Sequence, residues 1–179
     1  MKQIFLLSVF LLVLFSKITF ASPQAPDVII YNNKVLDLFA LPLEDYYKNK
    51  NDKPKFFISP QAGKSRYGRG YIAIWEITEN KLFLRGLDSW ICSSVTEADK
   101  PNCHRADLKE LFGEKAVKGK VPASWFTGEL RISDGELSGY FDETSAWFGQ
   151  SYEREIIMKV KAGKITNQII VDNSKQEHR

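Results

Sequence analysis

Alternation of apolar and polar positions dominates the chain and recurs around four short polar turns. The turns read "NNK" at 32–34, "ENK" at 79–81, "DGE" at 134–136 and "AGK" at 162–164. Their flanks, such as "YIAIWEI" and "LFLRGL" around the second turn, alternate with the period of two that half-buried strands show. Asn and Gly tolerate the positive φ angles of tight hairpin loops, so the pattern predicts four hairpins, with Asp134–Gly135 the strongest turn signal.

Four hairpins supply about eight strands. So many strands must form the core of the domain themselves, so the predicted fold class is mainly β. We expect an antiparallel β-sandwich or a partly closed barrel. One segment, "RADLKELFGEKA" at 105–116, has helical spacing, because Leu108, Leu111 and Phe112 fall on one face and Gly113 is a suitable stop. The stretch 46–70 is rich in Pro, Gly, Asn and basic residues and is predicted to be mostly loop.

Glu76 interrupts the apolar run of the second hairpin. A loop at 79–80 predicts three facing pairs on an apolar, core-directed side: Ile77 with Leu82, Trp75 with Leu84, and Ala73 with Gly86. Glu76 then lies on the other side of the sheet, diagonal to Arg85. The sequence therefore predicts a structural ion pair rather than a catalytic acid at this position.

Three blocks of the chain resemble a family of small bacterial proteins. They are "RGYIAIWEITENKLFL", "WFTGELRISDGEL" and "YEREIIMKVKAGKI", and the resemblance runs from about residue 27 to residue 171. The family shares a "GYIATWEI…KLYL" block, a later "TGELRI…G" block and a C-terminal "YE+…GK" block. No activity is established for that family, so the resemblance implies a fold and no chemistry.

The first residues read as a secretory leader. Lys2 precedes an apolar run from Ile4 to Phe15, and Thr19 and Ala21 place small side chains before a cleavage site at Ser22. The run is too short to cross a bilayer of about 30 Å as a helix. We therefore expect a signal peptide over residues 1–21, export to the periplasm or the medium, and a single β-rich domain over residues 22–179.

The net charge of the expected mature chain indicates which classes of partner it favours. The full chain carries a formal net charge of +3, and the leader contains two of its lysines. A nearly neutral mature protein gives no reason to expect nucleic acid or an anionic membrane as a partner. We also expect no membrane insertion after signal cleavage. No cofactor-binding motif occurs, so we expect no cofactor.

The two cysteines, Cys92 and Cys103, both lie in the expected mature domain. In an oxidising compartment a lone pair this close in sequence predicts one disulfide. The competing interpretations are a zinc site or a nucleophilic cysteine, for which His104 is the only nearby imidazole.

Residues for catalysis are few. His178 lies in the tail, and Ser-His-Asp chemistry would have to use His104. A carboxylate pair for glycoside cleavage stays open, and the candidates near aromatic residues are Glu76, Glu129, Asp142, Glu143 and Glu153. The acidic pairs Asp142–Glu143 and Glu97 with Asp99 do not form a calcium-loop pattern, so no metal site is expected.

Two loops are candidate binding surfaces. In "GKSRYGRG" at 63–70, Lys64, Arg66 and Arg69 alternate with glycine and an aromatic, a mix suited to a carboxylate or phosphate. In "DETSAWFGQS" at 142–151, Trp147 and Phe148 offer a large apolar anchor of the kind enriched at interfaces. The alternatives are a solvated basic loop and a Trp147 that packs into the core.

Two functional hypotheses follow from these observations. The first is a secreted or periplasmic, non-catalytic domain that binds a protein or a small ligand, a class that includes inhibitors and immunity proteins. The second is a carboxylate-dependent hydrolase acting on an envelope polysaccharide. The missing catalytic motifs favour the first hypothesis.

Overall fold

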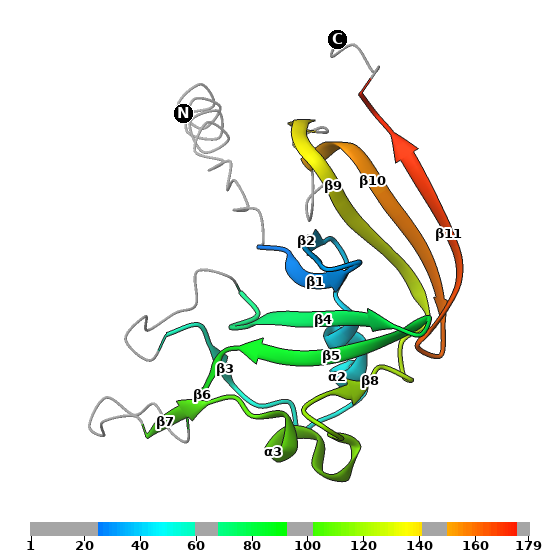
Figure 1. The fold of residues 1–179 in the computed structure, drawn as a ribbon. Coiled ribbons are helices and arrows are strands. Elements are labelled where there is room, and N and C mark those ends of the chain that lie inside the picture. Colours follow the sequence, from blue (N-terminus) through cyan, green and yellow to red (C-terminus); the bar gives the residue numbers. More distant parts are fainter. Residues whose placement is uncertain (1–24, 60–67, 93–101, 141–149, 175–179) are drawn as a thin grey trace, which may run out of the picture.

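A computed structural model describes residues 25–59, 68–92, 102–140 and 150–174 (Figure 1). The strands, in chain order, are β1 Asp27–Tyr31, β2 Lys34–Leu38, β3 Phe56–Phe57, β4 Ile72–Thr78, β5 Lys81–Asp88, β6 Trp90–Cys92, β7 Cys103–Arg105, β8 Val121–Pro122, β9 Gly128–Tyr140, β10 Gln150–Lys161 and β11 Lys164–Asp172. The helices are α2 Pro42–Tyr47, α3 Leu108–Phe112 and the 3-10 turn η1 Gly113–Lys115. The predicted mainly β fold class is confirmed.

One eight-stranded sheet forms the body of the protein, in the order β11-β10-β9-β2-β1-β4-β5-β8. It curls until β11 also pairs with β5, through Lys164 and Lys81. Backbone bonds reinforce this seam, since Leu82 N donates to Gly163 O over 2.8 Å and Ile165 N donates to Asn80 O over 2.9 Å. The sheet is therefore closed on itself at one end, as in a partly closed barrel.

One strand pair departs from the expected antiparallel order. β1 and β4 are parallel, with Val28 opposite Ile74 and Ile30 opposite Glu76. Parallel neighbours need a long crossover connection. The chain between β2 and β4 supplies it, and this connection contains α2 and β3.

Three of the four predicted hairpin turns are confirmed. Positive φ angles occur at Asn32 and Asn33, at Glu79 and Asn80, and at Ala162 and Gly163, and each pair joins two antiparallel strands.

The prediction at Asp134–Gly135 was wrong, because β9 runs straight through it as one thirteen-residue strand. Gly135 has a φ of 110°, and the register with β10 shifts between Tyr152 and Arg154. The local turn signal is thus used as a β-bulge, because continuous pairing with β10 outweighs a tight turn.

The second hairpin follows the predicted register near its turn. Ile77 pairs with Leu82 and Trp75 with Leu84, but a bulge after Ile74 moves Ala73 opposite Leu87. Ala73, Trp75, Leu82 and Leu84 are almost completely buried on the core side. The bulge is the reason why the predicted Ala73–Gly86 pair was wrong.

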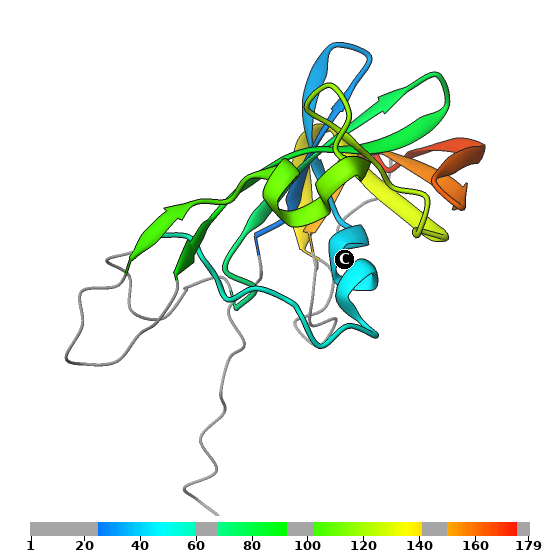
Figure 2. The same ribbon diagram turned by 90° about the horizontal axis from the view of Figure 1, so that it is seen from below.

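The two helices cover one end of the core and pack beside each other (Figure 2). Helix α2 was not predicted; Pro42 occupies its first turn, and Leu43 and Tyr47 point inward four residues apart. Helix α3 is shorter than predicted because it starts after Asp107, whose carboxylate accepts hydrogen bonds from the N–H groups of Lys109 and Glu110.

Aromatic side chains fill the space between the helices and the sheet. Tyr46 of α2 lies 4.9 Å from Phe112 of α3 and 4.8 Å from Trp125, as measured between ring centroids. Trp125 also donates its indole N–H to Pro42 O over 2.8 Å. Trp125 is therefore a packing residue at the corner of the fold.

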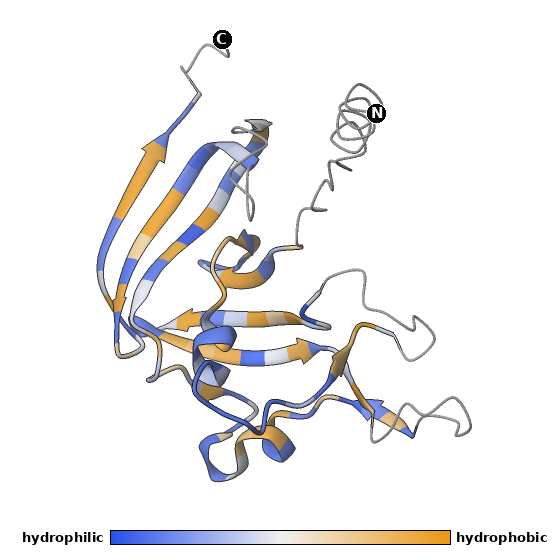
Figure 3. Cartoon of the chain, turned by 180° about the vertical axis from the view of Figure 1, so that it is seen from behind, coloured by the Kyte–Doolittle hydropathy of each residue, from blue (hydrophilic) through white to orange (hydrophobic). Residues whose placement is uncertain are grey.

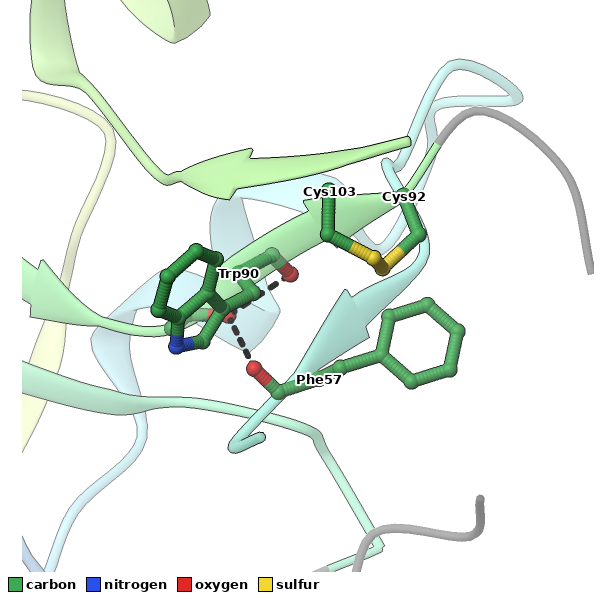
Figure 4. The surroundings of a disulfide bond; sticks show 5 residues. Phe57, Trp90, Cys92 and Cys103 are labelled. Carbon is green, nitrogen blue, oxygen red and sulfur yellow. Dashed lines mark hydrogen bonds between the residues drawn. A yellow bond between two sulfur atoms is a disulfide. The ribbon is translucent and has the colours of Figure 1, made fainter. Parts of the chain in front are cut away.

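The disulfide between Cys92 and Cys103 is confirmed, with an S–S distance of 2.12 Å. The two cysteines face each other across β6 and β7, in a separate three-stranded sheet with β3 (Figure 4). A loop of this length adds about 3 kcal/mol to stability on the chain-entropy account. The bond indicates an oxidising compartment.

Candidate functional site

Only one of the five predicted binding residues lies in the part of the chain that the structure describes. Lys64, Arg66, Trp147 and Phe148 lie outside the described residues. Arg69 is described, and it is only 9% exposed, so it is not the solvated loop cation that the sequence suggested as one alternative.

Arg69 pairs with a carboxylate, Asp27, that no sequence pattern marks as a candidate site residue. Asp27 begins β1 and is fully buried, and its Oδ1 lies 3.3 Å from Arg69 Nη2. The same carboxylate accepts hydrogen bonds from Ala73 N over 3.1 Å and from Trp75 Nε1 over 3.0 Å. Arg69 Nη2 also donates to Ala25 O over 2.7 Å. The pair thus joins the start of β1 to the chain that leads into β4.

Electrostatics show that this pair is costly to bury. Burial raises the pKa of Asp27 to about 6, against the opposing effects of Arg69 and of the hydrogen bonds from Trp75 and Ala73. Within the part of the chain that the structure describes, Arg69 Nε and Nη1 are buried without a hydrogen-bond partner. Loss of hydration is therefore only partly compensated on both sides of the pair.

A second group of polar residues continues from Arg69. The guanidinium lies 5.2 Å from the ring centre of Tyr71, whose hydroxyl donates to Glu44 Oε1 over 2.6 Å. Lys53 Nζ donates to both oxygens of Glu44, over 2.6 and 2.7 Å. Burial pushes the pKa of Glu44 upward, but the hydrogen bonds from Lys53 and Tyr71 outweigh it and hold the pKa below its usual value. The Glu44–Tyr71 hydrogen bond therefore links helix α2 to the residue that immediately precedes β4.

A second arginine–carboxylate pair lies on the outer side of β9 and β10. Arg131 donates two hydrogen bonds to Glu155, from Nε to Oε2 over 2.8 Å and from Nη2 to Oε1 over 2.7 Å. Its Nη2 also donates to the backbone oxygen of Gln150. The ring of Phe39 lies 5.0 Å from the Arg131 guanidinium and 5.5 Å from the ring of Tyr152. This pair fixes the first residues of β10, where the 142–151 segment joins the sheet.

The two pairs lie on opposite sides of β2 in the sheet. Asp27 and Ile132 both stand opposite Leu38, one on each side of β2. Two strand spacings, roughly 10 Å, therefore separate the backbones of Asp27 and Ile132. Asp27 faces the core, whereas Arg131, next to the buried Ile132, faces the opposite side. For Arg131 and Glu155 the sequence signal is a charge inside an otherwise apolar strand, the same signal as at Glu76. Arg69 was predicted as a loop cation, and its burial against Asp27 was not.

The candidate catalytic carboxylates do not converge where they are described. Glu129 stands opposite Lys159, six residues along β10 from Glu153, which corresponds to roughly 20 Å. Asp142 and Glu143 lie outside the described residues.

Glu76 has the structural pairing that the sequence predicted. Its Oε2 lies 3.6 Å from Arg85 Nε and also 3.4 Å from Lys120 Nζ. The hairpin register predicts the first partner but not Lys120, which lies 44 positions away in the chain.

The remaining candidates from the sequence are His104 and a metal site. His104 is exposed and its Nε2 lies 2.9 Å from Glu110 Oε2. Among the described residues, no cluster of three or more His, Cys, Asp or Glu side chains is arranged to hold a metal ion.

Comparison with known proteins yields no relative. No protein-family model matches the chain, and neither the curated proteins nor the solved structures contain a match. Within the described residues, no helix has the length and apolar character needed to cross a membrane.

Proposed function

We propose that this protein is an exported, non-catalytic domain that binds a protein or a small ligand through its 63–70 and 142–151 loops. The observation that carries the proposal is the arginine–carboxylate pair at the base of each loop. At the end of the first loop, Arg69 forms an ion pair with Asp27 over 3.3 Å. At the end of the second loop, Arg131 donates hydrogen bonds to Glu155 and to the backbone oxygen of Gln150. A rigid frame that presents variable loops is a common design for binding sites.

The chemistry of the loops complements this frame. Lys64 and Arg66 supply cations, and Trp147 and Phe148 supply an apolar anchor. Interfaces combine such groups, with aromatics at the centre and charges toward the rim. Export is supported by the disulfide and by the leader-like first residues. We also propose that the protein belongs to the family of small bacterial proteins that its three sequence blocks resemble.

The carboxylate-dependent hydrolase is the weaker alternative. Glycosidases need two carboxyl groups about 5–10 Å apart. Glu129 and Glu153 are roughly twice that distance from each other along the sheet, and Glu76 is bound to two cations. No observation on the described residues favours hydrolysis.

The test compares capture of partners by the wild type and by the double variant Trp147→Ala with Arg66→Ala. The bait is immobilised and exposed to the exported fraction of the native cell, and folding is checked by circular dichroism. We expect the folded double variant to lose the captured molecule. Val117→Ala is the matched control, because it removes an apolar side chain that is 57% exposed outside both loops. Undiminished capture by the folded double variant would place the site elsewhere, and loss of fold would show that Trp147 is a core residue.

A further inference from the structure

The two ends of the large sheet differ in how their edges are protected. β8 ends the sheet with only two residues, and Pro122 has no N–H to offer. Short edge strands and proline are the usual means by which proteins prevent edge-to-edge pairing. β11 ends the other side with nine residues and contains no proline. Among the described residues it pairs with β5 and the turn before β5 near its start, at Lys164 and Ile165.

The backbone of β11 presents unused pairing groups beyond this seam. Asn173 N donates to Glu153 O over 2.7 Å, so Asn173 points toward β10. In an antiparallel ladder the direction alternates from residue to residue, and no register shift occurs between Asn167 and Asp172. Ile169 and Val171 therefore bond to β10, whereas Gln168 and Ile170 turn their N–H and C=O groups outward. No described strand lies on that side of them.

The side chains of β11 are also unusual for a solvated edge. Ile169 is 52% exposed and Ile170 is 62% exposed, and consecutive residues occupy opposite faces of the strand. The apolar stretch is visible at the outer margin of the molecule in Figure 3. Natural sheets place charges, above all lysine, on edges that must stay unpaired. Between Thr166 and Val171 this edge carries none.

We propose that β11 is the contact between two copies of this chain, paired antiparallel about a two-fold axis through Ile170. The sequence of the edge is self-complementary in this register. On the core-side face, Ile170 meets Ile170 of the second copy. On the other face, Ile169 meets Val171 and Val171 meets Ile169, so each of the three apolar residues gains an apolar neighbour.

Backbone and charge also fit the second copy as the occupant. In an antiparallel pair, two residues that exchange both hydrogen bonds turn their N–H and C=O groups toward the partner strand. Ile170 has this orientation in each copy, so the two Ile170 residues can form such a pair. The register brings no like charges opposite each other, and a nearly neutral mature chain adds little long-range repulsion. The two-fold axis is the commonest symmetry of homodimers. A contact of one strand per copy is small, so the dimer is concentration-dependent.

Sedimentation velocity on the mature protein over a dilution series tests the proposal. We expect the wild type to sediment as a monomer–dimer equilibrium. Ile170→Lys places two like charges opposite each other at the axis, at a position exposed enough to leave the fold intact, and should raise the dissociation constant more than about tenfold. Ile170→Val keeps the outward N–H and the branched apolar shape, and should still dimerise.

Charge exchange then tests the register itself. Ile170→Glu alone should also be monomeric, because two carboxylates meet at the axis. An equimolar mixture of Ile170→Lys and Ile170→Glu should recover dimers, since opposite charges now meet. The proposal is overturned if the wild type is monomeric at all concentrations, if all variants dimerise alike, or if the mixture stays monomeric. None of these outcomes bears on the 63–70 and 142–151 loops.

Discussion

The pairs Asp27–Arg69 and Arg131–Glu155 use the same chemistry in two different environments. Asp27 and Arg69 have side-chain exposures of 0% and 5% and meet through one nitrogen at 3.3 Å. Glu155 and Arg131 have exposures of 9% and 23% and meet through two nitrogens at 2.7 and 2.8 Å. The more deeply buried pair is therefore the less completely hydrogen-bonded one. Burial, more than the number of bonds, decides what is lost when one partner is removed.

Removing the buried carboxylate should have the largest effect. Asp27→Ala leaves the Arg69 guanidinium uncompensated and takes the acceptor from Trp75 Nε1 and Ala73 N. We expect the free energy of unfolding, measured with urea at neutral pH, to fall by about 3–5 kcal/mol. The double variant Asp27→Ala with Arg69→Met should recover part of this loss, because no buried charge stays unpaired. A double variant less stable than the single one would contradict this account.

The pH dependence of stability sharpens the comparison. The pKa of Asp27 is raised from 3.8 to about 6 in the folded state. Well below pH 3.8 the group is protonated in both states and its stabilising contribution is complete. As the pH rises toward 6 the unfolded chain releases its proton first, so this contribution is lost.

The measurement is the difference in unfolding free energy between wild type and Asp27→Asn from about pH 4 to pH 7. The amide of the variant does not titrate, so Glu44 and the other carboxylates cancel in this difference. We expect the wild type to lose about 2 kcal/mol relative to the variant over this range. A difference that is flat, or that moves the other way, would mean that Arg69 outweighs the burial of Asp27.

The outer pair should respond less. Glu155→Gln removes the charge but keeps one acceptor for Arg131, and we expect a loss of about 1–3 kcal/mol in unfolding free energy at neutral pH. Arg131→Lys keeps the charge and loses the two-pronged geometry, so it should cost a similar amount. Arg154→Lys is the control, because Arg154 is 51% exposed and meets Asp134 through a single contact of 2.9 Å. An effect above that of Asp27→Ala would reverse the ranking by burial.

The smallest effect is expected at Glu76. Its partners Arg85 and Lys120 are 42% and 27% exposed and lie at 3.6 and 3.4 Å. Glu76→Gln should change the free energy of unfolding by at most about 1 kcal/mol, as for partly exposed ion pairs. A loss of several kcal/mol would show that the sheet depends on this carboxylate far more than its exposure suggests.

Local patterns in the sequence determined the β class, three hairpin turns, the Cys92–Cys103 disulfide and the Glu76–Arg85 contact. Each depends on residues close together in the chain, where φ preferences, period-two burial and a short loop act directly. The Asp134–Gly135 turn looked equally local. It became a bulge because β10, a separate strand, pairs along both sides of it.

Only the tertiary structure decided the parallel β1–β4 contact, the closure of β11 on β5 and the two arginine–carboxylate pairs. Asp27 and Arg69 are 42 positions apart in the chain, and Arg131 and Glu155 are 24 apart. Whether a charged residue in an apolar strand is buried, and against which partner, depends on the order of strands in the sheet. That order results from the burial of the whole core and from a long crossover, neither of which local periodicity records.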